Sequence, residues 1–391
     1  MKIVLTGGGS GGHITPILAV AAELNKLDPD TTLIYIGQKG DKMADIAVRH
    51  HLIDQSFMVS AGKWRRYHGE GWRQLLDMPT MARNIRDAFR MLAGIWQSYW
   101  LLGKIKPDAM FTPGGFVGVP VGIAARLRRV PVITHDLDAL PGLANRINAR
   151  WAVAHAVGQP KELYNYPSEA TFYVGVPVSA EFKPVTAEMQ KQAKQELGLA
   201  ADDLLVFVTG GGLGATRINN AVVAIIKELF DTYPSLTLIH TVGQGNEEPV
   251  QTAYNRALSP KEINRVRVLG YTTELFRYTT AADVVITRAG ANTMAELSVQ
   301  HKACIVVPNP VLTGGHQLKN VMHLEKDHAI VVVQEKELAA DKQALLAVLN
   351  ELLIDAKKRQ TFGEHFGTYA KPQAARELAQ LIIDKTLEAN Q

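Results

Sequence analysis

The stretch Lys2-Ile-Val-Leu-Thr6, Gly7-Gly-Gly-Ser-Gly-Gly-His13, Pro16-Ile-Leu-Ala-Val-Ala-Ala-Glu-Leu24 reads as an apolar strand, a glycine-rich turn and an apolar helix. The same order returns in Leu204-Leu-Val-Phe-Val-Thr209, Gly210-Gly-Gly-Leu-Gly-Ala215 and Asn219-Asn-Ala-Val-Val-Ala-Ile-Ile226. Glycine lets the backbone approach a ligand closely, and the amides and dipole at the following helix start favour negative charge. The duplicated turn predicts two nucleotide-type α/β domains that face each other across a cleft.

Strand and helix patterns alternate along the chain, which predicts mostly parallel sheets with helices on both faces. The strands predicted in the first half are Ile3–Leu5, Thr32–Ile36, Ala109–Phe111, Val132–Thr134, Ala152–Val157 and Thr171–Val174. Those predicted in the second half are Leu204–Val208, Leu236–His240, Val266–Leu269, Val284–Ile286, Cys304–Val307 and Ile330–Val333. A hinge is expected near Pro177, so that the first domain spans 1–177 with the final helix, 372–391, and the second spans 178–371.

Composition agrees with two globular domains. The chain has 391 residues, of which 47% are hydrophobic and 20% are charged, and domains usually hold about 100–200 residues. The single cysteine, Cys304, lies in an apolar run and is expected to be a buried thiol in a reducing, cytoplasmic setting. The strand at the very start leaves no room for a secretory signal. No apolar run reaches the roughly 18–20 residues that cross a bilayer.

The positive charge is concentrated between Lys63 and Arg90. This segment holds seven Lys/Arg and three acids, an excess of 7 − 3 = +4 that equals the net charge of the whole chain. Interleaved aromatic residues suit an anionic membrane surface, and the residues expected there are Lys63, Trp64, Arg65, Arg66, Trp72 and Arg73. A solvated basic loop before a core helix is the open alternative. For Trp96 and Trp100, core packing is favoured over lipid contact. No nucleic-acid partner is expected.

Two common glycine-loop functions do not fit. The first turn matches the G-x-G-x-x-G pattern of nicotinamide dehydrogenases, which expect an acidic residue at the end of the second strand. That strand here ends in Gly37 and Gln38, without a carboxylate. The turn also places His13 where a phosphate-binding P-loop needs lysine, and no Ser or Thr follows directly. Both classes are therefore disfavoured.

A third motif, Arg288-Ala-Gly-Ala-Asn-Thr-Met-Ala-Glu296, follows a predicted strand. Its small residues would let a diphosphate lie on the helix start, and the carboxylate of Glu296 could accept hydrogen bonds from two ribose hydroxyls. A helix capped by Asn292 or Thr293, with Glu296 as its capping-box partner, is an equally open interpretation. Downstream, His316, Gln317 and Asn320 offer polar groups suited to sugar hydroxyls.

These motifs occur in the same order as in the MurG family, which the chain therefore resembles. The motifs that carry the resemblance are Gly8-Gly-Ser-Gly-Gly-His-Ile-Thr-Pro16, Lys106-Pro-Asp108, Pro113-Gly-Gly-Phe116, Gly210-Gly-Gly-Leu-Gly-Ala215, Arg288 to Glu296 and Gly315-His-Gln-Leu-Lys-Asn320. The family implies the two-domain GT-B fold and transfer of N-acetylglucosamine from UDP-GlcNAc to lipid I, which gives lipid II. It also implies inversion without an obligatory metal or other cofactor, and a peripheral location on the cytoplasmic face of the cell membrane.

The resemblance also implies roles for individual residues. The implied donor-binding residues are Ser10, Gly11, Gly12, Asp138, Gly212, Gly214, Thr272, Arg288, Gly290, Ala291, Asn292, Thr293, Met294, Ala295, Glu296 and Gln317. The implied acceptor-binding residues are Gly114, Gly115 and Asn145. His13 is a candidate general base because its ordinary pKa is about 6.5, and Asp136 is its rival.

The chain departs from the family pattern at several positions. His135-Asp-Leu-Asp138 stands where the family has His-Glu-Gln-Asn, and its DxD pattern keeps a divalent metal open. Ser179 replaces an arginine that contacts phosphate, and Arg288 or Arg217 could compensate; Gly212 replaces a serine. Three alternatives stay open: a glycolipid synthase with a diacylglycerol acceptor, a non-hydrolysing UDP-GlcNAc 2-epimerase, and a non-catalytic membrane scaffold.

Overall fold

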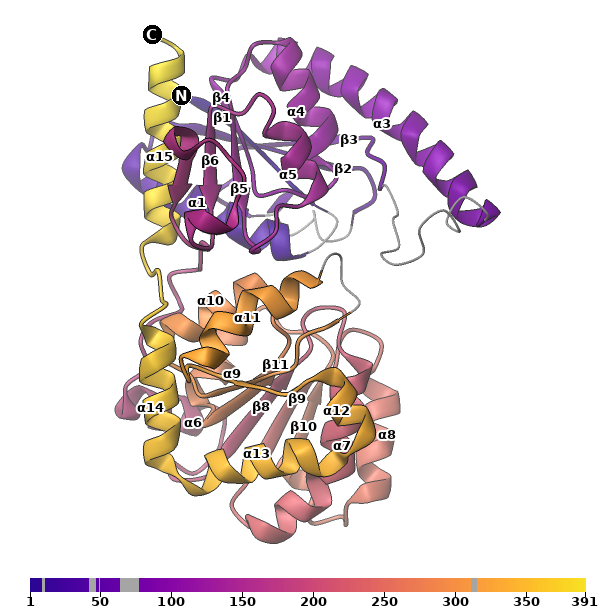
Figure 1. The fold of residues 1–391 in the computed structure, drawn as a ribbon, viewed down its shortest axis with the longest axis vertical. Coiled ribbons are helices and arrows are strands. Elements are labelled where there is room, and N and C mark those ends of the chain that lie inside the picture. Colours follow the sequence, from indigo (N-terminus) through magenta and orange to yellow (C-terminus); the bar gives the residue numbers. More distant parts are fainter. Residues whose placement is uncertain (9–10, 42–46, 49, 64–76, 311–314) are drawn as a thin grey trace. The chain divides into compact units, whose positions relative to one another are not determined.

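The computed structural model describes residues 1–8, 11–41, 47–48, 50–63, 77–310 and 315–391. The fold divides into two compact units (Figure 1). Unit 1 comprises Met1–Ala180 and Lys371–Gln391, and unit 2 comprises Glu181–Ala370. The chain thus leaves unit 1 just after the predicted hinge at Pro177 and re-enters it for its last helix.

Unit 1 contains a parallel sheet that has seven strands among the described residues, in the order β3-β2-β1-β4-β5-β6-β7. The strands are β1 (Lys2–Thr6), β2 (Thr32–Gln38), β3 (Gln55–Val59), β4 (Ala109–Thr112), β5 (Val132–Asp136), β6 (Ala154–Val157) and β7 (Thr171–Tyr173). The sequence prediction missed β3. This strand lies at the sheet edge with only Val59 fully buried, so its sequence lacks the apolar run that marks the central strands.

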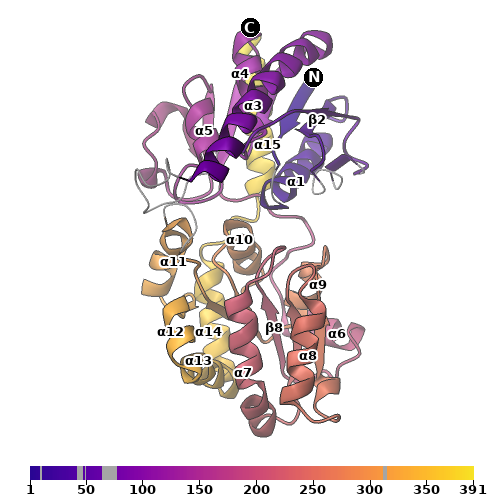
Figure 2. The same cartoon turned by 90° about the vertical axis from the view of Figure 1, so that its right-hand side faces the viewer.

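Helices cover both faces of this sheet. On one face, α1 (Gly11–Leu27) and the final helix α15 (Ala374–Ala389) pack together against alternate residues of β1, β2 and β4. On the other face lie α3 (Met78–Ile105) and α4 (Gly118–Leu127) (Figure 2). The remaining short elements are α5 (Leu143–Asn148), η2 (Lys161–Leu163) and η3 (Ser168–Ala170).

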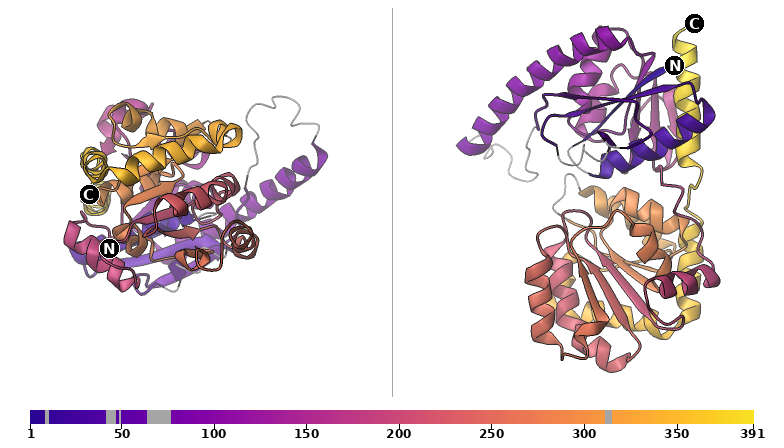
Figure 3. Two further views of the ribbon diagram at one scale, coloured as in Figure 1. Left: turned by 90° about the horizontal axis from the view of Figure 1, so that it is seen from below. Right: turned by 180° about the vertical axis from the view of Figure 1, so that it is seen from behind.

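Unit 2 repeats the architecture with a parallel sheet of six described strands, in the order β10-β9-β8-β11-β12-β13. The strands are β8 (Leu205–Thr209), β9 (Thr237–Thr241), β10 (Val266–Leu269), β11 (Val284–Thr287), β12 (Cys304–Val306) and β13 (Val331–Val332). One face packs against α7 (Thr216–Thr232), α8 (Glu247–Ala257), α12 (Glu335–Ala340) and α13 (Lys342–Ile354). The other face packs against α6 (Ala187–Glu196), α9 (Leu275–Ala281), α10 (Ala291–Val299), α11 (His316–Lys326) and α14 (Ala356–Gly367) (Figure 3). The short helix η4 (Ile263–Arg265) precedes β10.

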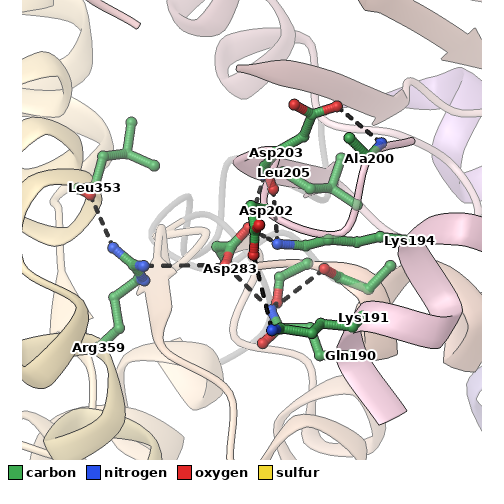
Figure 4. A network of polar contacts seen from close by, with 12 residues as sticks. Gln190, Lys191, Lys194, Ala200, Asp202, Asp203, Leu205, Asp283, Leu353 and Arg359 are labelled. Atoms are coloured by element: carbon green, nitrogen blue, oxygen red, sulfur yellow. Dashed lines mark hydrogen bonds and ion pairs between the residues drawn. The ribbon is translucent and has the colours of Figure 1, made fainter. Parts of the chain in front are cut away.

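A buried ion pair fastens α6 to the sheet of unit 2. Lys194 Nζ lies 2.8 Å from the carboxylate of Asp283, and both side chains are almost fully buried (Figure 4). The same carboxylate accepts hydrogen bonds from the Leu205 amide at 2.8 Å and from Gln190 Nε2 at 3.2 Å. Arg359 of α14 approaches it to 4.0 Å. One acidic residue just before β11 therefore ties two helices to the central strands.

Strand order fixes where a ligand would bind. In unit 1 the chain runs from β1 outward to β2 and β3, and then returns to β4 on the other side of β1. In unit 2 it runs from β8 to β9 and β10, and then returns to β11. Ligands of such sheets bind at the carboxyl ends of the strands where the order reverses. Both glycine-rich turns begin there, after Thr6 and after Thr209.

Candidate functional site

The first glycine-rich turn packs closely against the loop after β4. Gly115 has a left-handed φ of +84°, and a Cβ at this position would lie 2.5 Å from the carbonyl oxygen of Gly8. A side chain is excluded there, which explains the second glycine of the Pro113–Phe116 motif. Gly11 and Gly12 form the first turn of α1, whereas Ser10 lies outside the described residues.

Three predicted site residues of unit 1 lie together around Gly114. This glycine has φ +103°, and a Cβ on it would lie 3.5 Å from His13 Nε2 and 3.4 Å from Asn145 Nδ2. Burial lowers the pKa of His13 below its usual 6.5, and the nearby Asp138 opposes that shift. The imidazole is therefore neutral at pH 7 and can accept a proton. A candidate base and candidate acceptor-binding groups thus share one small region.

Asp136 is enclosed by hydrogen-bond donors. Asn145 Nδ2 donates to its Oδ1 at 2.9 Å, and the Tyr166 hydroxyl donates to its Oδ2 at 2.8 Å. Burial raises the pKa of Asp136 to about 6, against the effect of these hydrogen bonds. Asn145 also donates to the carbonyl oxygen of His135 at 2.8 Å. In this arrangement Asp136 orients the Asn145 amide.

The predicted DxD pair is split between two environments. Asp136 is buried, whereas Asp138 is partly exposed and its backbone oxygen accepts a hydrogen bond from Tyr164 at 2.8 Å. Within the parts of the chain that the structure describes, there is no group of three or more His, Cys, Asp or Glu side chains suited to a metal ion.

In unit 2, the second glycine-rich turn lies beside the loop that follows β10. A Cβ on Gly212 would lie 3.5 Å from the Tyr271 ring. The side chain of Leu213, at the tip of the turn, is 94% exposed. Thr272 uses its hydroxyl oxygen locally, since it accepts a hydrogen bond from the Glu274 amide at 3.0 Å.

The structure excludes the interpretation of the Arg288–Glu296 motif as a helix capped by Asn292 or Thr293. Gly290 is the N-cap of α10 and supplies no side-chain hydrogen bond, so neither Asn292 nor Thr293 caps the helix. The residues Ala291, Asn292, Thr293, Met294, Ala295 and Glu296 all lie in the helix itself. A helix start without a side-chain cap favours an anionic ligand. The open space around Gly290, where a Cβ would meet nothing within 4 Å, also allows a ligand to approach.

Glu296 is a buried carboxyl group in the second turn of α10. Glu296 is only 7% exposed, and burial raises the pKa of its carboxyl group to about 7. Burial of a carboxyl group has a desolvation cost that an exposed glutamate avoids. A buried carboxyl with a raised pKa is therefore unusual where its role is only structural. It fits a group that accepts hydrogen bonds from a ligand.

Arg288 is held by a partner that sequence reasoning missed. Its guanidinium lies 2.6 Å from the carboxylate of Glu335, which is the first residue of α12, and it also donates to the Val307 carbonyl at 3.1 Å. Arg217 lies 2.8 Å from the other oxygen of Glu335. Only Arg217, whose side chain is 58% exposed, remains accessible to solvent. The lone Glu335 gave no sequence signal, because its partners are far away along the chain.

Gln317 also has a backbone partner. Its Oε1 accepts a hydrogen bond from the Asn309 amide at 2.8 Å, so the side chain links the first turn of α11 to Asn309. Asn320, one turn later, donates to the carbonyl oxygen of Ala289 at 3.3 Å. The α11 start is thereby tied to the loop that opens α10.

Two family models match the chain. The model of the glycosyltransferase family 28 N-terminal domain matches residues 3–157, and that of the C-terminal domain matches residues 205–379. A protein of Symbiobacterium thermophilum is 31% identical over 389 residues, covering 98% of this chain and 96% of its own length. One of Caldicellulosiruptor saccharolyticus is 30% identical over 383 residues, covering 98% and 97%. Both carry the name UDP-N-acetylglucosamine–N-acetylmuramyl-(pentapeptide) pyrophosphoryl-undecaprenol N-acetylglucosamine transferase. The chain belongs to the MurG family.

As a MurG-family member the chain is a glycosyltransferase, and solved structures share its fold. The crystal structure of Acinetobacter baumannii MurG aligns with a TM-score of 0.71 at 22% identity, covering 98% of this chain and 99% of that chain. A UDP-GlcNAc 2-epimerase from Neisseria meningitidis, bound to UDP-GlcNAc, aligns with a TM-score of 0.65 at 14% identity, covering 99% and 100%. The predicted GT-B fold with two Rossmann-like domains is confirmed.

The prediction for the two tryptophans of α3 is wrong. Trp96 is 66% exposed and Trp100 is 54% exposed. The opposite side of α3 packs on the unit instead, because Gly94 and Ser98 are small enough for close contact; a Cβ on Gly94 would lie 1.9 Å from the Ser60 carbonyl oxygen. The predicted membrane residue Lys63 is exposed. The other predicted membrane residues, Trp64, Arg65, Arg66, Trp72 and Arg73, lie outside the described residues.

The exposed side of α3 is apolar over several turns. Its members are Ile85 (56%), Phe89 (69%), Leu92 (64%), Trp96 and Trp100. Spacings of three and four residues place them on one side of the helix, whose N-terminal half extends beyond the sheet of unit 1 (Figure 1). Among the described helices of this MurG-family chain, none has the length and hydropathy of a bilayer-spanning segment.

Proposed function

We propose that this chain transfers N-acetylglucosamine from UDP-GlcNAc to the 4-hydroxyl of the N-acetylmuramyl residue of lipid I, with inversion, to give lipid II for peptidoglycan synthesis. The relatives named above carry this activity in their names. The observation that supports it most directly is the start of α10, which combines a helix N-terminus without a side-chain cap and the buried carboxyl of Glu296.

Unit 2 binds the donor in this proposal. The amides of Ala291 and its neighbours receive the diphosphate, and Glu296 accepts hydrogen bonds from the ribose hydroxyls. The Thr272 backbone contacts the uracil. Both arginines pair with Glu335, but Arg288 is largely buried and Arg217 is mostly exposed. The guanidinium of Arg217 therefore supplies the positive charge for the leaving diphosphate.

Unit 1 binds the acceptor. The hydroxyl of the acceptor sugar attacks the anomeric carbon from the side opposite UDP, and its proton passes to His13. Two observations favour His13 over Asp136 as the base. His13 lies beside Gly114 and Asn145, the candidate acceptor-binding residues, whereas both oxygens of Asp136 accept hydrogen bonds from protein donors.

The exposed apolar side of α3 brings the enzyme to its lipid substrate. Trp96 and Trp100 belong to the residue types that favour the headgroup layer of a bilayer. Arg83, which lies on the same helix, supplies positive charge for anionic lipids on the cytoplasmic face. The chain then acts as a peripheral protein of that surface.

One assay separates this function from its alternatives. Purified full-length chain is incubated with radiolabelled UDP-GlcNAc and lipid I, diacylglycerol, or no acceptor. Label in lipid II is the expected product. Label in a diacylglycerol glycoside would instead identify a glycolipid synthase, and conversion of the donor without lipid would identify an epimerase.

A further inference from the structure

A fully buried polar chain in unit 2 ends at the second glycine-rich turn. His240 lies in β9, Asn219 in α7 and Tyr254 in α8, and their exposures are 0%, 2% and 0%. His240 Nδ1 lies 2.8 Å from the Tyr254 hydroxyl, and His240 Nε2 lies 3.1 Å from Asn219 Oδ1. Asn219 Nδ2 donates to the carbonyl oxygen of Val242 at 3.0 Å. Three elements are thus joined by one continuous path of hydrogen bonds.

The direction of every proton in this path is fixed by chemistry. The Val242 carbonyl can only accept, so the Asn219 amide nitrogen must face it and Oδ1 must face His240. His240 then carries its proton on Nε2, and its Nδ1 accepts from Tyr254. Burial lowers the pKa of His240 to about 3, so the ring stays neutral and keeps this single tautomer.

The path ends against the glycine-rich turn itself. Gly214 has φ +74°, and a Cβ on it would lie 2.1 Å from the Val242 carbonyl oxygen. Gly243, with φ +90°, also packs against Gly214, since a Cβ on it would lie 2.4 Å from the Gly214 amide nitrogen. The carbonyl held by Asn219 therefore sets the position of the turn. Asn246 Nδ2 donates to the same oxygen at 3.2 Å.

We propose that Tyr254, His240 and Asn219 form a positioning relay that holds the second glycine-rich turn in the conformation that binds the donor diphosphate. The proposal rests on the proposed function, because the turn is taken as part of the UDP-sugar site. These residues do not touch the donor; they act through Val242 and Gly214. Ordinary core packing would not need three polar groups in one directed path, since such groups are costly to bury.

Loss of a positioning relay should lower UDP affinity, whereas loss of simple core packing should lower only the stability of the fold. Removing Asn219 takes away the closer of the two side-chain donors to the Val242 carbonyl and leaves only Asn246 at 3.2 Å. The turn is then held less firmly, so UDP affinity falls more than global stability predicts. The groove of about 360 Å³ between α7 and α8 is lined by Asn219 and Asn246 as well as by small apolar residues. Water can enter there once Asn219 is shortened, which replaces the lost hydrogen bond to the Val242 carbonyl and keeps the fold intact.

The test compares four relay variants with one packing control in the full-length chain. Asn219→Ala, His240→Leu, Tyr254→Phe and the conservative His240→Gln are measured beside Ile225→Ala, which removes buried apolar contact on the same helix α7. UDP affinity is measured by calorimetry well below each unfolding midpoint. Amide hydrogen exchange is followed at Gly212–Gly214.

Asn219→Ala is expected to weaken UDP binding about tenfold and to speed exchange in the turn. His240→Leu has a smaller effect, and Tyr254→Phe the smallest, because they lie successively farther from Val242. His240→Gln keeps one donor and one acceptor and restores much of the affinity that His240→Leu loses. Ile225→Ala lowers the unfolding midpoint but leaves UDP affinity unchanged.

Relay variants that unfold more easily but bind UDP like the wild type would overturn the positioning role. So would a loss of affinity in Ile225→Ala that matches its loss in Asn219→Ala. If the wild-type chain itself binds neither UDP nor UDP-GlcNAc, the proposed function fails instead, and the hydrogen-exchange comparison still decides whether the relay holds the turn.

Discussion

Arg288 and Glu335 form an ion pair of 2.6 Å in which both side chains are largely buried. The pair joins the loop that opens α10 to the first residue of α12. Arg217 shares the same carboxylate but is mostly exposed. The two arginines therefore have different roles, and substitution separates them.

Arg288→Ala leaves the buried Glu335 carboxylate without its closer partner and should destabilise unit 2 by roughly 3 kcal/mol. Arg217→Ala removes an exposed side chain and should change stability by less than about 0.5 kcal/mol, while UDP affinity falls several-fold. Urea unfolding and calorimetric titration with UDP measure the two effects. Equal UDP affinity in Arg217→Ala and the wild type would exclude its contact with the diphosphate.

The two halves of the fold could be predicted because their signals are local. Each glycine-rich turn lies between an apolar strand and an apolar helix, and β1 and β8 occur where the pattern placed them. Edge strand β3 could not be predicted, because its residues are half exposed and lack an apolar run. The family resemblance implies Gly114, Asn145 and His13 as site residues, and only the fold shows that they lie together.

Other features depend on contacts that the sequence does not display. Glu335 is 47 positions from Arg288 and 118 from Arg217, so no window of sequence connects them. The α3 prediction failed for a related reason. Both sides of this helix carry residues that could face a core, and the small Gly94 decides which side packs because it allows the closest backbone approach. Hydrophobic periodicity alone does not show which side of a helix fits closely against neighbouring backbone.

Glu296 should make stability and donor binding respond to pH in opposite directions. Its folded pKa of about 7 is above the usual 4.5, so the folded state holds this proton more tightly than the unfolded state. The resulting stabilisation is complete below pH 4.5 and is lost as the pH rises through 7. Relative to Glu296→Gln, the wild type should lose roughly 2–3 kcal/mol of stability between pH 5 and pH 8.

Donor binding should show the reverse trend, because only the ionised carboxylate of Glu296 accepts two hydrogen bonds from the ribose. Affinity for UDP-GlcNAc, whose diphosphate has no titrating proton in this range, should rise with pH through 7 in the wild type and stay flat in Glu296→Gln. Glu248→Gln on the exposed side of α8 is the control for a general charge effect. A wild-type affinity that does not vary with pH would count against the ribose contact.

The exposed side of α3 should carry membrane binding. The double variant Trp96→Ser, Trp100→Ser removes two aromatic side chains whose ring centroids lie 6.4 Å apart. Both face solvent, so the unfolding midpoint should hardly change. Binding to vesicles that contain anionic lipid should weaken about tenfold or more. Co-sedimentation measures it, and Leu127→Ser, an exposed apolar residue outside α3, is the matched control. Wild-type binding by the double variant would move the membrane site elsewhere.

Addition of a chelator should leave transfer unchanged if helix amides and Arg217 stabilise the leaving diphosphate without a metal ion. Initial rates are compared with EDTA and with added Mg²⁺ or Mn²⁺. A rate that collapses with EDTA and returns with one cation would show that a divalent ion is needed. Asp138→Asn, which keeps the shape of the side chain but removes its charge, would then test whether the DxD pattern binds the ion.

The identity of the base can be decided by pH profiles of three variants. His13→Ala should lower kcat about 100-fold or more. In the wild type, the acid limb of kcat/KM should lie below pH 6.5, because burial lowers the pKa of His13. Asp138 opposes that shift, so Asp138→Asn should move the limb to still lower pH. Asp136→Asn should keep the limb and act chiefly through the acceptor KM, since Asp136 orients Asn145. If the acid limb of kcat/KM disappears in Asp136→Asn and survives in His13→Ala, Asp136 and not His13 is the general base. The carboxyl of Asp136, whose pKa burial raises to about 6, would then take the proton.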